Sequence, residues 1–228
     1  MTAGAQARVA LAVARKDALA ELRGRSATTS TLFFAALVLL LFGFALGPDA
    51  ARLAQAAPGL LWLAIVFAGL LAVARLHQLE TDDGALEQLA LAPVPRRAIY
   101  AGKALAAFGV MLVLGAVLVP LMGLLYAVDL AGGWAGLLAA VLLGTLGFAA
   151  VGTFYAGVTV RLRAREVMLP LLVLPIVAPL LLAAVKATGA ALTGDPFDEL
   201  GAWLQLLVAF DVVMLIAGAG AYGFLLDE

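Results

Sequence analysis

Six long apolar runs, separated by polar stretches, set the pattern of this chain. The runs cover residues 30–47, 58–76, 104–128, 134–160, 167–187 and 202–224. A hydrocarbon layer about 30 Å thick takes about 20 helical residues to cross. The first run is slightly short of that length and the others fit. Apolar and polar residues do not alternate as they would in the strands of an outer-membrane barrel. The pattern predicts an all-α, polytopic membrane protein with six transmembrane helices.

Residues 8–25, ahead of the first run, have the pattern of an amphipathic helix. The apolar positions are Val9, Leu11, Val13, Leu19 and Leu22, and the polar ones are Arg15, Lys16, Asp17, Glu21 and Arg23. Such a helix can lie in the headgroup layer, where its basic residues meet anionic lipid. We expect a cytoplasmic elbow helix that leads into the first span, with a solvated leader as the simpler alternative.

Residues 80–103 form a polar stretch between the second and third spans. Gly84 breaks the chain, residues 85–91 follow as a short helix, and Pro93 and Pro95 end it. Its leucines could insert into a groove on a partner, while Glu87 and Gln88 could pair with polar groups there. We interpret the segment as a stiff coupling helix, rather than a loop that only returns the chain. Arg96, Arg97 and Lys103 are then expected to meet the lipid headgroups.

Composition supports a membrane protein, since 65% of the residues are hydrophobic and only 13% are charged. No loop is long enough for a soluble domain, so residues 1–228 are expected to form one transmembrane domain. The chain has no cysteine and one histidine, which excludes disulfides, thiolate metal sites and sites that need two imidazoles from this chain. The net charge of −1 gives no indication of a nucleic-acid partner.

The basic residues predict the orientation, because Lys and Arg gather on the cytoplasmic side of membrane proteins. With the N-terminus inside, twelve basic residues are cytoplasmic: Arg8, Arg15, Lys16, Arg23, Arg25, Arg75, Arg96, Arg97, Lys103, Arg161, Arg163 and Arg165. Only Arg52 and Lys186 lie outside. We therefore expect a bacterial cytoplasmic membrane protein with both termini inside. The outer segment 188–201 is expected to form short re-entrant or interfacial helices.

Proline and glycine mark two of the spans. The fifth span contains Pro170, Pro175 and Pro179, so we expect a kinked or partly broken helix that either lines a path or simply bends. The fourth span contains small residues that let another helix approach closely. These are Ala140, Gly144, Gly147, Gly152 and Gly157.

Asp211 is the one acid deep inside a span. A charge at mid-membrane costs about 2.5–3.5 kcal/mol on insertion scales, so Asp211 should face protein, as a proton or substrate site or as a structural hydrogen-bonding group. His77 ends the second span and is interpreted as an interfacial residue rather than a haem or metal ligand. Three tryptophans are expected in the aromatic belts near span ends, namely Trp62, Trp134 and Trp203.

No nucleophile–base pair, metal cluster or phosphate-binding glycine loop of the Walker A type appears in the sequence. The chain is therefore not expected to be an enzyme. If it works with ATP, a separate subunit must bind and hydrolyse the nucleotide.

Four stretches in sequence order carry a resemblance: RKDALAELR (15–23), FGFALGP (42–48), APGLLWLAIVFAGLLAVARL (57–76) and DDGALEQLALAPVP (82–95). The last resembles the coupling segment of ABC-2-type export permeases, in which an acid–Gly–x–Leu–Glu–Gln–Leu stretch docks on the ATPase. Together the four resemble the CcmB family, the haem exporter protein B permeases of cytochrome c maturation. The resemblance covers about residues 12–125 and is generic beyond them.

The resemblance implies a membrane subunit that couples ATP hydrolysis to haem export or to release of a haem chaperone. It implies a CcmA-like ATPase, two copies of each subunit, CcmC-like and CcmD-like membrane partners, and an indirect link to a CcmE-like haem chaperone. Haem would be a handled ligand rather than a stably bound cofactor. The implied ATPase-coupling residues are Asp83, Gly84, Leu86, Glu87, Gln88, Leu89, Leu91 and Pro93.

Three alternatives stay open at the level of sequence. The chain could be an ABC-2-type exporter permease for a lipid, a drug or a polysaccharide. It could be a scaffold that carries no substrate and transmits ATPase motion to a haem-handling partner. A secondary carrier centred on Asp211 is the third, and ATP dependence would exclude it.

Overall fold

The computed structural model describes residues 3–23, 25–82, 95–159 and 165–225. The helices are α1 (Ala3–Arg23), α2 (Arg25–Leu46), α3 (Ala50–Asp82), α5 (Arg96–Tyr126), α6 (Trp134–Thr159), α7 (Arg165–Thr193) and α8 (Leu200–Leu225). The described residues contain no strand. The all-α fold predicted from the apolar pattern is therefore confirmed.

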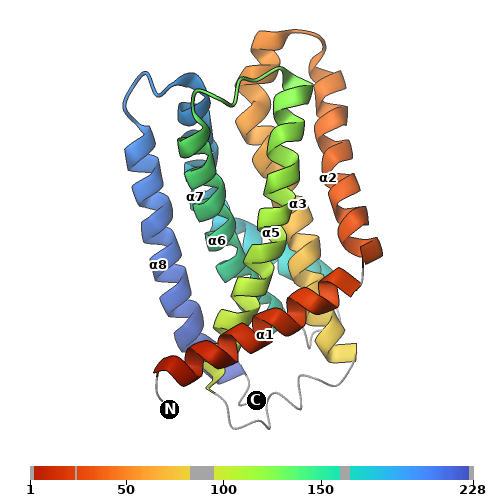
Figure 1. Cartoon of the computed structure of the whole chain (residues 1–228), viewed down its shortest axis with the longest axis vertical. Coiled ribbons are helices and arrows are strands. Elements are labelled where there is room, and N and C mark those ends of the chain that lie inside the picture. Colours follow the sequence, from red (N-terminus) through yellow and green to blue (C-terminus); the bar gives the residue numbers. More distant parts are fainter. Residues whose placement is uncertain (1–2, 24, 83–94, 160–164, 226–228) are drawn as a thin grey trace.

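Six of these helices, all except α1, are long and apolar enough to cross a membrane, which confirms the six predicted spans. They run side by side, and α1 lies across one end of them (Figure 1). We call this end the α1 end. Helices α3, α6 and α8 finish there, and α5 and α7 begin there. The short connections 47–49, 127–133 and 194–199 lie at the opposite end.

The amphipathic helix predicted at 8–25 corresponds to α1, which begins earlier, at Ala3. Its faces differ from the expected division between polar and apolar residues. Asp17 and Glu21 are buried together with Val13, while Leu11 and Leu19 are exposed. Two acids therefore face the protein, and two leucines face the surroundings.

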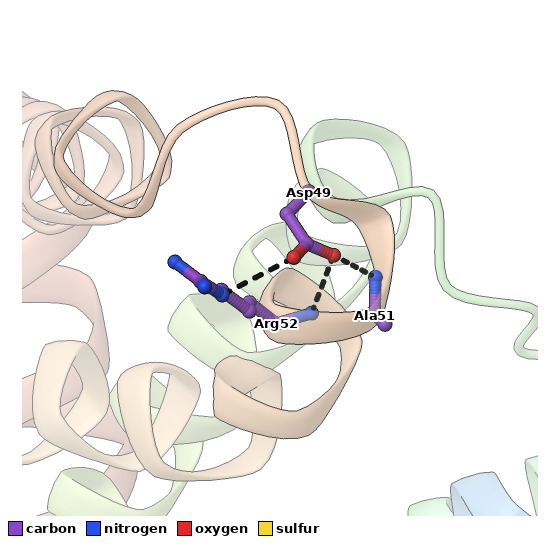
Figure 2. Close-up of polar contacts among 3 residues, drawn as sticks. All are labelled: Asp49, Ala51 and Arg52. Atoms are coloured by element: carbon purple, nitrogen blue, oxygen red, sulfur yellow. Dashed lines mark hydrogen bonds and ion pairs between the residues drawn. The ribbon is translucent and has the colours of Figure 1, made fainter.

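Asp49 begins α3 at the opposite end of the bundle. One carboxylate oxygen accepts the backbone N–H groups of Ala51 and Arg52 at 3.0 and 3.3 Å, and the other lies 3.1 Å from Nε of Arg52 (Figure 2). The first N–H groups of a helix have no intrahelical partner. The side chain therefore caps α3, and the preceding Gly47, with a φ of 77°, supplies the tight turn out of α2.

Asp195 plays the same part for α8. Its carboxylate accepts the backbone N–H groups of Glu199 and Leu200 at 2.8 and 3.2 Å. Helix α7 continues to Thr193, and residues 194–199 form only a turn. The prediction of short helices within 188–201 was wrong, because the small and apolar residues before Gly194 extend α7 instead.

Helix α7 is one continuous helix that contains Pro170, Pro175 and Pro179. The predicted partial break is therefore wrong. Helices α3, α6 and α8 pack against α7. In a membrane, such neighbouring helices allow a proline-containing helix to persist where an isolated one would break.

The glycines of α6 confirm the prediction of close helix packing. A methyl group on Gly144 would overlap the ring of Trp62 from α3, and one on Gly157 would lie 2.8 Å from the ring of Tyr222 from α8. Trp62 is 1% exposed, and its indole N–H donates to the Thr188 hydroxyl at 2.9 Å. The belt position predicted for Trp62 was wrong, because the space left by Gly144 and the Thr188 acceptor hold its ring in the core. Trp134, in contrast, is exposed at the opposite end.

Candidate functional site

The predicted coupling residues, Asp83, Gly84, Leu86, Glu87, Gln88, Leu89, Leu91 and Pro93, lie outside the described residues. The two helices that flank them are described. Helix α3 ends at Asp82 and α5 begins at Arg96, both at the α1 end. The first two turns of α5, residues 96–103, are therefore the first helical residues that the structure describes after the predicted coupling segment. We call these residues the foot of α5.

Pro95 sets the start of the foot. Its backbone is extended, with φ −64° and ψ 125°, and its carbonyl accepts the N–H groups of Ala98 and Ile99 at 2.9 and 3.4 Å. Proline has no N–H to lose at a helix start and favours an abrupt beginning. The chain therefore passes from Pro95 into α5 without a flexible turn.

Tyr100 joins the foot to α6 and α8. Its hydroxyl donates to the carbonyl of Ala150 at 3.0 Å, and its ring centroid lies 5.4 Å from that of Tyr222. Gly218 leaves room for the Tyr100 hydroxyl, because a methyl group there would overlap it. Aromatic pairs at this separation attract each other. Tyr100 thus attaches the foot to α6 by a hydrogen bond and to α8 by an aromatic contact.

Gly102 joins the foot to α1. A methyl group at this position would lie 2.5 Å from the carbonyl oxygen of Ala10 and 2.7 Å from Cβ of Val13. The two backbones therefore approach as closely as a glycine allows, as small residues permit at helix crossings in membranes. Helix α1 lies directly on the foot.

Lys103 corrects the expectation that it meets the headgroups. It is 2% exposed, and its Nζ lies 3.8 Å from a carboxylate oxygen of Asp17, which is 4% exposed. Asp17 also pairs with Lys16 at 3.1 Å. A buried charge is costly unless it is paired, and this contact places the buried acid of α1 beside the buried lysine of α5. Arg97, the basic residue six positions earlier, is exposed.

His77 lies near the end of α3 and was interpreted as an interfacial residue. It is buried, and its Nδ1 is 3.0 Å from the carbonyl oxygen of Val73 one turn earlier. A neutral imidazole with the proton on Nδ1 would donate this hydrogen bond. The side chain therefore belongs to the packed end of α3.

Asp211 faces protein, as predicted. It is 3% exposed on α8 and packs against Gly147 of α6, where a methyl group would overlap a carboxylate oxygen and lie 2.7 Å from Leu180. Neither carboxylate oxygen has a hydrogen-bond partner in the described part of the chain. Asp211 lies seven residues before Gly218, which touches the foot, so about 10 Å of α8 separates the two sites. The structure does not bring them together.

The sequence of the chain matches a known protein family. The model of the CcmB protein family matches residues 8–226, nearly the whole chain. The chain belongs to the CcmB family. It is 38% identical over 174 residues to the heme exporter protein B of Paracoccus denitrificans, covering 74% of this chain and 78% of that protein. It is 34% identical over 212 residues to the protein of that name from Bradyrhizobium diazoefficiens, covering 91% and 92%.

The CcmB family match extends well beyond residues 12–125, where the sequence resemblance was good. The heme exporter protein B of Escherichia coli is 34% identical over 182 residues, covering 78% of this chain and 80% of that protein. In this CcmB chain the Asp17–Lys103 pair was missed by sequence reasoning. The available signal was the spacing of Val13 and Asp17, which puts an acid on the same face of α1 as an apolar residue.

Proposed function

We propose that this CcmB-family chain is the membrane subunit of an ABC-type complex of c-type cytochrome maturation. In this role it couples ATP hydrolysis by a separate CcmA-like ATPase to haem export or to release of a haem chaperone. The family match over residues 8–226 carries this proposal. The relatives named heme exporter protein B support the link to haem.

The ATPase would dock on residues 83–93. Helix α3 ends and helix α5 begins at the α1 end. A force on this segment would therefore act first on the end of α3 and the foot of α5. The foot contacts α1 through Gly102 and α6 through Tyr100. A displacement of the coupling segment would therefore be passed to several helices at once.

The α1 end would face the cytoplasm, with both termini there, in the bacterial inner membrane. The excess of basic residues assigned to this side supports this orientation. The complex would hold two copies of this chain and two ATPases, together with CcmC-like and CcmD-like membrane subunits. A CcmE-like chaperone would receive the haem outside.

A second function is favoured by the single, buried histidine. The chain could transmit ATPase motion to a haem-handling partner without carrying haem itself. Its one histidine is buried at the end of α3, and axial haem ligation by two imidazoles would need a second one. In this version haem is handled by the partner, and no cofactor is held by this chain.

Complementation tests the proposed function. In a bacterial strain that lacks its own CcmB protein, the chain should restore c-type cytochromes, seen by haem staining, and should purify with the ATPase in mild detergent. A failure of both would overturn the proposal. Proteoliposomes that contain the whole complex separate the two versions, because ATP-dependent entry of haem into the lumen is expected only from an exporter.

A further inference from the structure

An apolar groove of about 840 Å³ runs between α1, the start of α2 and the middle of α5. Leu11 and Ala14 line it from α1, Thr29 from α2, and Leu105, Gly109 and Val113 from α5. The volume lies within the range of about 300–1,000 Å³ that is usual for small-molecule sites. The groove lies beside the α1–α5 crossing at Gly102 and is separate from the contacts of Asp17 and Lys103.

The groove opens away from the helix bundle. Leu11, Leu105 and Val113 line it and are 64%, 47% and 54% exposed. Leu105 and Val113 belong to a candidate membrane span, α5, so in a bilayer these exposed apolar side chains would meet hydrocarbon. A hydrocarbon chain is therefore the surrounding material that matches this groove.

Arg15 adds a charge to the lining of the groove. It lines the groove from α1, is exposed, and has no ion pair or hydrogen bond within the described residues. A guanidinium group binds phosphate oxygens through paired N–H donors. Glu21, the acid that also lines the groove, lies six residues further along α1 and is buried. The lining therefore carries an exposed cation, Arg15, and a buried acid, Glu21.

We propose that this groove binds an anionic phospholipid. The phosphate of its headgroup pairs with Arg15, and an acyl chain lies along Leu105, Gly109 and Val113. The lipid fills the space between α1 and the two spans, and it holds α1 at the level of the headgroups. This lipid binding needs no ATPase and no haem, so its test is independent of the test of the proposed function.

Native mass spectrometry of the purified, delipidated full chain tests the proposal. Titration with phosphatidylglycerol should give more bound lipid than titration with phosphatidylcholine of the same acyl chains. Arg15→Gln should weaken phosphatidylglycerol binding about five-fold, the equivalent of about 1 kcal/mol for one basic residue at a membrane surface. Arg8→Gln is the matched control, because Arg8 lies on the same helix outside the groove and donates to the Gly4 carbonyl. It should leave binding unchanged.

Gly109 gives a second test that keeps Arg15. A Cβ at this position meets no atom within 4 Å, so Gly109→Leu should fill the groove without disturbing the backbone and should lower lipid binding. Gly109→Ala should retain it. Equal binding of the two lipids, an unchanged Arg15→Gln variant, or undiminished binding by Gly109→Leu would each overturn the proposal. Conversion of a dimer into a monomer by Gly109→Leu would assign the groove to a second copy, and displacement of phosphatidylglycerol by haem would assign it to a porphyrin.

Discussion

Lys103 and Asp17 join the membrane span α5 to the transverse helix α1 through a buried ion pair, with Nζ of Lys103 3.8 Å from a carboxylate oxygen of Asp17. The contact follows directly on the close crossing at Gly102. Burial removes both charges from water, so the loss of either one would leave the other buried with one partner fewer. The pair therefore fixes where α1 lies on the foot of α5, which follows the predicted coupling segment in the sequence.

Loss of one partner of this pair should cost more than loss of both. Lys103→Met is expected to lower the free energy of unfolding by about 1.5–3 kcal/mol, because the buried carboxylate of Asp17 loses its cation on α5 while it retains Lys16 at 3.1 Å. Adding Asp17→Asn should recover part of that loss. Thermal unfolding of the purified chain in mild detergent measures both. Lys186→Met, at an exposed position of α7, is the control. Simple addition of the two single effects would contradict the pair.

The α1–α5 crossing predicts a contrast between two glycines of the same helix. Gly102→Ala should destabilise the chain by about 1–3 kcal/mol, because the new methyl group meets the Ala10 carbonyl and Val13. Gly109→Ala, two turns later, meets nothing within 4 Å and should be neutral or stabilising by up to about 1 kcal/mol. The unfolding midpoints of the two variants provide the comparison. Equal effects would mean that α1 does not lie on Gly102.

The spans could be predicted from the sequence because each one depends only on the residues within it. Each run had to be apolar over the thickness of a bilayer, and a helix satisfies its own backbone. The glycines of α6 were predicted as packing positions from the residues of that helix alone. A small side chain in a span leaves a space, and another helix fills it.

The errors concern residues whose environment depends on distant parts of the chain. Lys103 was predicted to meet the lipid headgroups because Asp17 of α1, which lies beside it, is 86 positions away in the sequence. Trp62 was predicted to lie in an aromatic belt because its hydrogen-bond acceptor, Thr188 of α7, and the space beside Gly144 of α6 come from distant helices. The spacing of Val13 and Asp17 puts the acid on the inner face of α1, but spacing within one helix does not identify the residue that it meets, since the pairing depends on which helices are neighbours.

The predicted coupling segment can be tested without disturbing the spans. Leu86→Arg or Glu87→Arg should lower copurification of the ATPase by about ten-fold or more, the effect of losing an interface residue worth about 1.4 kcal/mol. Membrane insertion should be unchanged. Asp198→Arg, in the turn at the opposite end, is the control substitution. Undiminished copurification, together with undiminished ATPase stimulation, would count against docking on this segment.

The orientation predicts opposite behaviour of two reporter fusions. A reporter that is active only in the periplasm should be silent after Glu228 and active when inserted at Gly194, in the turn between α7 and α8. The reason is the excess of basic residues at the α1 end, which should stay inside. A cytoplasmic reporter at the same two positions gives the complementary reading. The reverse pattern would place the coupling segment outside, where a cytoplasmic ATPase could not bind it.

Asp211 should act as a structural group rather than by changing its charge. Asp211→Asn has nearly the same shape and fits the same space against Gly147, so stability should change by less than about 1 kcal/mol and c-type cytochrome production should be retained. Gly147→Ala, in contrast, pushes a methyl group into Asp211 and Leu180 and should destabilise by about 1–3 kcal/mol. Gly152→Ala, which meets Val73 only at 3.3 Å or more, should be milder. Haem staining and unfolding midpoints separate these outcomes. If Asp211→Asn assembles normally and production is lost, the ionisation of Asp211 drives a step, and the structural role is wrong.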